Sequence, residues 1–155
     1  MGGRRMMWIA GIGLILVAGL LAYIRLAPSE PGRWHVDLTA GELPRAHVFC
    51  LRPDSDPDMG DPKALLARLD AIALATPRTV RLAGSVEEGR ITWITRSSLM
   101  GYPDYTTAQV MDGPGLCVAG RQRFGSEDLG VNAARISGWI QELLGLPERP
   151  EMTGF

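Results

Sequence analysis

The first part of the chain is an apolar run that strongly limits where the chain can reside. Residues 6–24 contain no charged side chain. At 1.5 Å of rise per residue, a helix of this length covers roughly the 30 Å hydrocarbon core of a bilayer. A core helix of a small soluble domain needs a polar stripe on its exposed side, and this run has none. The run therefore predicts a transmembrane anchor over residues 6–26, with the lipid bilayer as its partner.

The charges that flank the run predict its orientation. Arg4, Arg5 and the amino terminus precede it, whereas Arg25 alone follows it closely. Because positive charge stays on the cytoplasmic side, residues 1–5 are expected in the cytoplasm and the remaining chain in the periplasm. The predicted location is a bacterial inner membrane, crossed once. A cleavable signal peptide is the alternative, but the run is longer than a usual signal core and no small-x-small site follows before Pro28.

The net charge of the residues beyond the anchor limits which kinds of partner the exported part can bind. The chain has 16 basic and 17 acidic residues, and three of the basic ones flank the apolar run, which leaves a net charge of about −4 for the exported part. Proteins that bind nucleic acid present a basic face, so nucleic acid is not expected as a partner. The sequence also contains no polybasic stripe of the kind that binds anionic lipid.

The segment that follows the anchor has few signals of regular structure. Residues 27–60 are typical of a spacer and an irregular segment rich in proline, in which only residues 46–51 suggest an extended stretch. A helix is then expected from Asp61, a good N-cap residue, and Pro62, which suits the first helical position. Thr76-Pro77 predicts its end.

Short turns separate the runs that follow this helix. Strands are expected over residues 79–86, 90–97, 105–111 and 116–124, and connections this short favour an antiparallel meander. A second helix is expected over residues 132–144. Residues 146–155 are expected to form a flexible tail. The predicted fold class is α+β, with a transmembrane helix followed by a two-layer domain over residues 61–145. The domain is expected to contain a helix, a four-stranded meander and a second helix, with both helices on one face of the sheet.

The cysteines and histidines give weak signals. Cys50 and Cys117 could form a disulfide in an oxidising compartment, but their apolar, strand-like surroundings favour buried free thiols. His47 and Cys50 could supply two metal ligands, yet no second pair completes a tetrahedral site. No nucleophile elbow, phosphate loop, dinucleotide fingerprint or haem-attachment motif occurs. We therefore expect no metal, no cofactor and no catalytic residue.

Polar residues concentrate between the last predicted strand and the second helix. The candidate site residues are Arg96, Asp104, Arg121, Arg123, Asp128, Asn132 and Arg135. In one interpretation, the arginines and the free amides of the helix N-terminus bind an anionic group such as a carboxylate or phosphate. In the other, which we favour, Asp128 pairs with an arginine to hold the strand–helix corner, and Asn132 caps the helix.

The same segment carries a family resemblance. Arg-x-Arg-x-Gly-x-x-Asp-x-Gly-x-Asn-x-x-Arg over residues 121–135 resembles the signature of the family catalogued as domain of unknown function 1499. Residues 33–37, 95–97 and 100–105 are also similar to family segments, so the resemblance covers roughly residues 33–145. Gly120 and Gln122 stand where members usually have serines. The resemblance implies a bacterial or plastid-type envelope protein and implies no established activity.

These signals favour a non-catalytic module that binds a small anionic molecule, a lipid headgroup or an envelope protein. The first alternative is a hydrolase using Asp104 or Asp128, although neighbouring arginines depress the pKa of a carboxyl group and make it a poor proton donor. The second is a structural subunit of a membrane complex, recruited through Gly11, Gly13 and Gly19. An open pocket with unpaired arginines would favour a binding function. A sealed salt-bridge cluster would favour a structural role, and an exposed carboxylate in an apolar cleft would favour catalysis.

Overall fold

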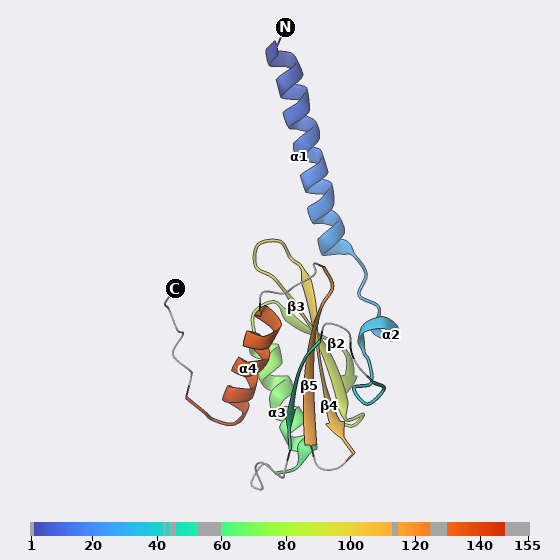
Figure 1. Ribbon diagram of the computed structural model, residues 1–155, viewed down its shortest axis with the longest axis vertical. Coiled ribbons are helices and arrows are strands. Elements are labelled where there is room, and N and C mark those ends of the chain that lie inside the picture. Colours follow the sequence, from blue (N-terminus) through green and yellow to red (C-terminus); the bar gives the residue numbers. More distant parts are fainter. Residues whose placement is uncertain are drawn as a thin grey trace.

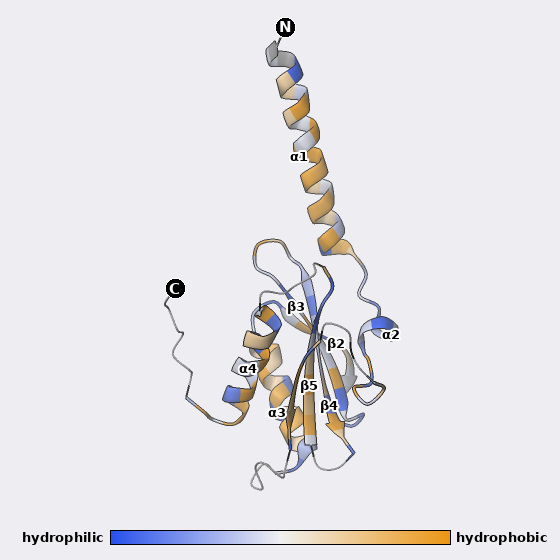
Figure 2. Ribbon diagram, in the orientation of Figure 1, coloured by the Kyte–Doolittle hydropathy of each residue, from blue (hydrophilic) through white to orange (hydrophobic). Residues whose placement is uncertain are grey.

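A computed structural model describes residues 2–41, 43, 46–52, 60–112, 115–124 and 130–147. Its first helix, α1 (Gly2–Leu26), extends away from a domain built of a sheet and helices, as Figure 1 shows. Apolar residues line this helix along its length (Figure 2). By length and composition, the segment Arg5–Leu26 could cross a membrane. Only its C-terminal end is covered by the domain, where Ile24 is buried.

The domain contains one antiparallel sheet. The strands are β1 (His47–Leu51), β2 (Thr79–Ser85), β3 (Arg90–Arg96), β4 (Pro103–Met111) and β5 (Gly115–Gln122). Their order is β1-β5-β4-β3-β2, so β2 to β5 form the predicted meander. The prediction of four strands omitted β1, which adds to the free edge of β5. A strand of five residues with a distant partner lacks the local turn that makes a hairpin recognisable.

Two helices cover one face of the sheet, as predicted. In α3 (Pro62–Ala75) the Asp61 side chain accepts hydrogen bonds from the Lys63 and Ala64 amides, which confirms it as the N-cap. The second helix is α4 (Val131–Leu143). Trp93 of β3 and Trp139 of α4 meet edge to face, with ring centroids 5.7 Å apart, at the centre of the core. Side chains alternate between the two faces of a strand, so Trp93 and every second residue from it point toward the helices. This side of the sheet is here called the helix face.

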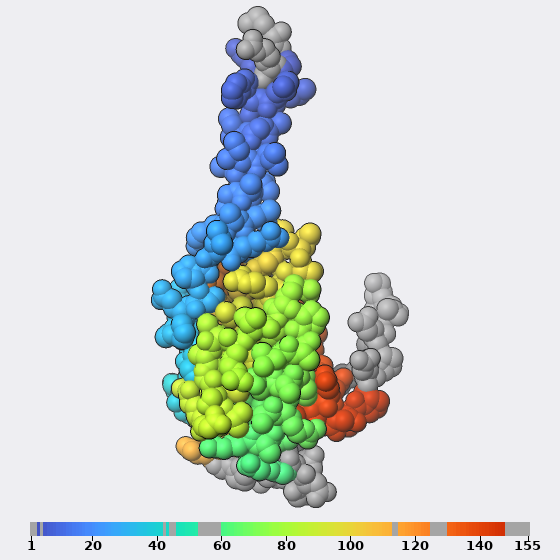
Figure 3. All heavy atoms as spheres, turned by 180° about the vertical axis from the view of Figure 1, so that it is seen from behind, coloured from blue at the N-terminus to red at the C-terminus, as the bar shows by residue number. Residues whose placement is uncertain are grey.

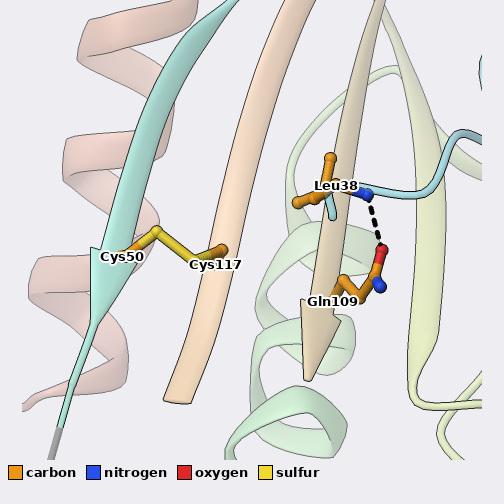
Figure 4. Close-up of a disulfide and its surroundings, with 4 residues drawn as sticks. All are labelled: Leu38, Cys50, Gln109 and Cys117. Carbon is orange, nitrogen blue, oxygen red and sulfur yellow. Dashed lines mark hydrogen bonds between the residues drawn. A yellow bond between two sulfur atoms is a disulfide. The ribbon is translucent and has the colours of Figure 1, made fainter. Parts of the chain in front are cut away.

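The opposite face of the sheet, here called the outer face, is covered by the segment after α1. The short helix α2 (Pro31–Trp34) places the Trp34 ring flat on the Tyr105 ring, with centroids 3.8 Å apart. Ile94 and Leu82 pack against the same pair. Beyond it, the Leu38 amide donates to the Gln109 Oε1 atom at 2.8 Å (Figure 4). Part of the stretch predicted as a spacer is thus a third layer, because the outer face presents apolar side chains that need cover.

The two cysteines form a disulfide, so the preference for free thiols is wrong. Cys50 of β1 lies directly opposite Cys117 of β5 in the strand register, with Cα atoms 4.1 Å apart. Figure 4 shows the bond joining the two neighbouring strands. Facing positions on adjacent antiparallel strands bring two sulfur atoms within bonding reach. That proximity depends on β1, which the sequence did not predict as a member of the sheet.

Candidate functional site

The candidate residues that the structure describes lie in three places. Arg121 of β5 and Arg123, directly after β5, are on the outer face; Asp104, Asn132 and Arg135 are on the helix face; and Arg96 ends β3 near α1. Asp128 lies outside the described residues. The sheet separates the first two groups, because neighbouring residues of a strand point to opposite faces.

Arg121 and Arg123 hold the segment after α1 against the domain. The Arg121 guanidinium donates to the Trp34 carbonyl at 3.0 Å and lies over the Trp34 ring, 5.2 Å from its centroid. Arg123 donates to the Pro28 carbonyl at 2.7 Å. Burial lowers the pKa of Arg121, and the nearby positive charge of Arg33 lowers it further. These two arginines share the outer face, and their described contacts are structural.

Asp104, Asn132 and Arg135 meet between β4 and α4. Arg135 Nη1 lies 3.6 Å from Asp104 Oδ2, and Arg135 Nη2 donates to Asn132 Oδ1 and, at 3.3 Å, to Thr106 Oγ1. Asn132 is 1% exposed. The expectation that Asn132 caps the helix is wrong. The N-cap position is Gly130, with a φ of +79°. The Asn132 amide belongs instead to a polar contact that joins the helix to the sheet.

Gly120 explains how α4 approaches β5 closely at this point. A Cβ atom at residue 120 would lie 3.0 Å from Asn132 Cβ and 3.0 Å from Ile136 Cδ1. Glycine therefore suits this position, since it leaves room for these two side chains. In the site formed by Asp104, Asn132 and Arg135, Asn132 is buried and the two charged side chains are largely covered.

Arg96 lines an open pocket at the α1 end of the outer face. The pocket, here called the arginine pocket, has a volume of about 480 Å³ and is lined by Arg25, Arg78, Val80, Ile94, Arg96, Ser97, Ser98 and Gly101. Its walls come from the last turn of α1, the start of β2, the end of β3 and the loop between β3 and β4. In Figure 3 the C-terminal end of α1 lies directly against that loop, drawn in yellow.

The arginines of this pocket retain most of their hydrogen-bonding capacity. Each donates a side-chain hydrogen bond to a backbone carbonyl: Arg25 to Leu99 at 3.1 Å, Arg78 to Arg96 at 3.1 Å and Arg96 to Gly101 at 3.0 Å. A guanidinium has five N–H donors. In the described part of the chain, no ion pair involves any of the three. Positive charge therefore accumulates around the pocket without a neighbouring carboxylate to neutralise it.

Two backbone features position these arginines. Arg78 has a φ of 61°, which is unusual for a residue other than glycine, and the Arg96 amide donates to its carbonyl at 3.0 Å. Gly101 has a φ of +75°, and a Cβ there would lie 2.9 Å from Arg25 Cγ. The Arg25 side chain thus rests on the bare backbone of the loop. The sequence predicted a role for Arg96 but not for Arg25 or Arg78, which are far away along the chain.

Sequence reasoning also missed a polar network around His35. The Nδ1 atom of His35 lies 2.9 Å from Thr92 Oγ1, and its Nε2 atom lies 2.8 Å from Glu88 Oε1. The Arg90 Nε atom lies 3.1 Å from the same Nε2 atom, and Arg90 also donates to Glu88 Oε1 at 3.1 Å. A carboxylate, a histidine and a hydroxyl in series resemble a nucleophile with its base. Thr92, however, is 0% exposed and its hydroxyl is shared with Thr107 at 2.8 Å, so no substrate can reach it.

This network instead fastens the segment after α2 to the sheet. Hydrogen bonds from Thr39 and Gln109 lower the pKa of Asp37 to about 2, and the hydrogen bond with His35 lowers the pKa of Glu88. Both carboxyl groups are therefore ionised acceptors near neutral pH. A base catalyst needs a pKa closer to the working pH, so neither carboxyl is suited to that role.

No cluster of three or more metal-ligand side chains occurs among the described residues. His47 and Cys50, set aside above as a pair of metal ligands, do not offer a thiolate, because the Cys50 sulfur is bonded to Cys117. A disulfide sulfur is not a thiolate, and the thiolate is the form that binds metal.

The chain belongs to the family described as protein of unknown function (DUF1499), whose pattern matches residues 51–143. The match covers more than half of the chain and confirms the resemblance seen in the sequence. No curated protein matches the chain at a significant level.

Proposed function

We propose that this member of the DUF1499 family is a single-pass inner-membrane protein whose periplasmic domain binds an anionic group in the arginine pocket. The observation that carries the proposal is an open pocket bordered by three arginines that have no described ion-pair partner. Binding is favoured over acid–base catalysis because the pocket lining contains no carboxylate, histidine or cysteine.

Two independent features support the location. Arg4 and Arg5 precede the apolar helix, which favours a cytoplasmic amino terminus. The disulfide between Cys50 and Cys117 belongs to an oxidising compartment, and the periplasm is one. Both features support the same orientation, with the domain in the periplasm.

The hydrolase alternative finds no support in the described geometry. Asp104 lies on the helix face, where it pairs with Arg135, and it does not border the arginine pocket. The Asp104 side chain is 19% exposed and is engaged by Arg135 of α4, which restricts the access that an acid or base catalyst needs. Arg96, in contrast, is the candidate residue that the fold leaves open to a ligand.

Anion binding predicts a specific loss in an Arg96→Gln variant. We expect inorganic phosphate to shift the amide NMR signals of Ser97, Ser98 and Gly101 in the full chain, held in a maltoside detergent that contains no phosphate. Because a charge-assisted hydrogen bond contributes about 1.5–3 kcal/mol, Arg96→Gln should weaken phosphate binding roughly tenfold or more.

Arg52→Gln is the matched control for charge. Arg52 is exposed at the end of β1, away from the pocket. The variant should bind phosphate as the unmodified chain does. Equal affinities of the Arg96 and Arg52 variants would contradict the proposed site.

Export of the domain is tested by a reporter. Alkaline phosphatase needs disulfides and is active only outside the cytoplasm, so a fusion after residue 145 should be active. The same fusion without residues 2–26 should be inactive, since it lacks the predicted anchor. An inactive full-length fusion that is present in the membrane fraction would show the opposite orientation.

A further inference from the structure

The fold gathers arginines at the α1 end of the domain, although the domain is acidic as a whole. The structure brings these residues together from positions far apart in the sequence: Arg25, Arg33, Arg78, Arg96, Arg121 and Arg123. Strand register explains part of this, because the end of β3 lies beside the start of β2 and of β4. The sequence showed no polybasic stripe, yet the tertiary structure builds a basic surface.

This basic end lies at the level where a bilayer would end. Arg25 is in the last turn of α1, immediately before the end of the segment long enough to cross a membrane. Aromatic rings surround the same level: Phe124 lies 6.3 Å from Tyr23 and 5.6 Å from Tyr102, measured between ring centroids. Tyrosine is enriched where a membrane helix leaves the hydrocarbon. Leu99, 81% exposed at the tip of the loop between β3 and β4, lies at this end too.

The arginine pocket has the chemistry of a phosphodiester site with an apolar side. Arg25, Arg78 and Arg96 supply charged donors, and Ser97 and Ser98 supply hydroxyl groups. Val80 and Ile94 contribute apolar walls. A free inorganic anion gains nothing from apolar walls, whereas a phospholipid carries acyl chains that pack favourably against them. The lining therefore suits a molecule that is anionic at one end and apolar next to it.

We propose that the occupant of the arginine pocket is the phosphodiester headgroup of an anionic phospholipid from the leaflet next to the domain. The assignment rests on the proposed function, because it identifies the anion that the pocket binds. The anchor holds the pocket beside the headgroups, so the bilayer presents its ligand at a high local concentration. The domain is then fixed to the membrane at two points, the helix and the pocket.

The test uses the full chain in nanodiscs of phosphatidylcholine, with and without phosphatidylglycerol. We expect phosphatidylglycerol to shift the amide signals of Ser97, Ser98 and Gly101. A Val80→Glu variant places a negative charge on the pocket wall at a side chain that is 58% exposed, where folding tolerates it. This variant should reduce the apparent affinity for phosphatidylglycerol roughly tenfold or more, since the added carboxylate repels the phosphate. The uncharged control Val80→Gln should retain binding.

The outcomes separate the two proposals. If inorganic phosphate shifts the pocket amides in maltoside detergent but phosphatidylglycerol does not shift them in nanodiscs, anion binding stands and the lipid assignment is overturned. If neither ligand shifts them, both proposals fail. An equal response of the Val80→Glu and Val80→Gln variants to phosphatidylglycerol would place the lipid elsewhere and also overturn the assignment.

Discussion

Replacing Trp34 with alanine should lower the free energy of unfolding of the domain by about 3–5 kcal/mol, the usual cost of deleting a buried aromatic side chain. Trp34 is 6% exposed and stacks on Tyr105. It also lies beneath the guanidinium of Arg121, whose hydrogen bond to the Trp34 carbonyl depends on the same docking. Loss of the ring uncovers the outer face and loosens the segment that joins α1 to the sheet.

Urea unfolding of the full chain in detergent, followed by near-ultraviolet circular dichroism, measures this effect. Trp34→Phe should lose less stability because a ring remains to stack on Tyr105. Trp8→Ala is the matched control, since Trp8 is 72% exposed on α1 and has no contact with the core of the domain. If Trp34→Ala and Trp8→Ala unfold at the same urea concentration, the third layer contributes nothing to stability.

The second large effect is expected from the disulfide. Cys50 and Cys117 close a loop of 67 positions, and a cross-link of that length removes about 4 kcal/mol of chain entropy from the unfolded state. A Cys50→Ala, Cys117→Ala double variant should be destabilised by about that amount. The loss should concentrate at β1, where Val48 and Phe49 are exposed and pairing with β5 is the main attachment.

Reduction of the unmodified chain should reproduce the stability of the double variant. A thiol titration of protein purified without reductant should find no free sulfhydryl. Two reactive thiols in that preparation would show that the disulfide does not form. One of the two observations that support a periplasmic domain would then be lost.

Local patterns predicted most of the elements. Asp61 and Pro62 marked the start of α3, and the strand expected over residues 90–97 is β3, which has Trp93 in the core and Ile94 on the other face. These predictions hold because helix caps and strand alternation depend on neighbours within a few residues. Short turns likewise predicted the meander from β2 to β5.

The candidate site could be predicted only in part, because its members depend on contacts that are distant in the sequence. Arg121 and Arg135 are close along the chain, yet β5 and α4 place them on opposite sides of the sheet. Arg96 was identified, whereas its pocket partners Arg25 and Arg78 carry no local motif. The fold brings them together through the end of α1 and the start of β2.

The amino-acid sequence by itself determined the apolar helix, the four strands of the meander and the two helices that cover it, because each follows from hydrophobic periodicity and turn residues within one segment. Only the tertiary structure decided that Cys50 meets Cys117, that Trp34 covers the outer face and that the arginines border one pocket. Those contacts join residues tens of positions apart. Their free energy comes from packing and pairing between elements, which no single segment encodes.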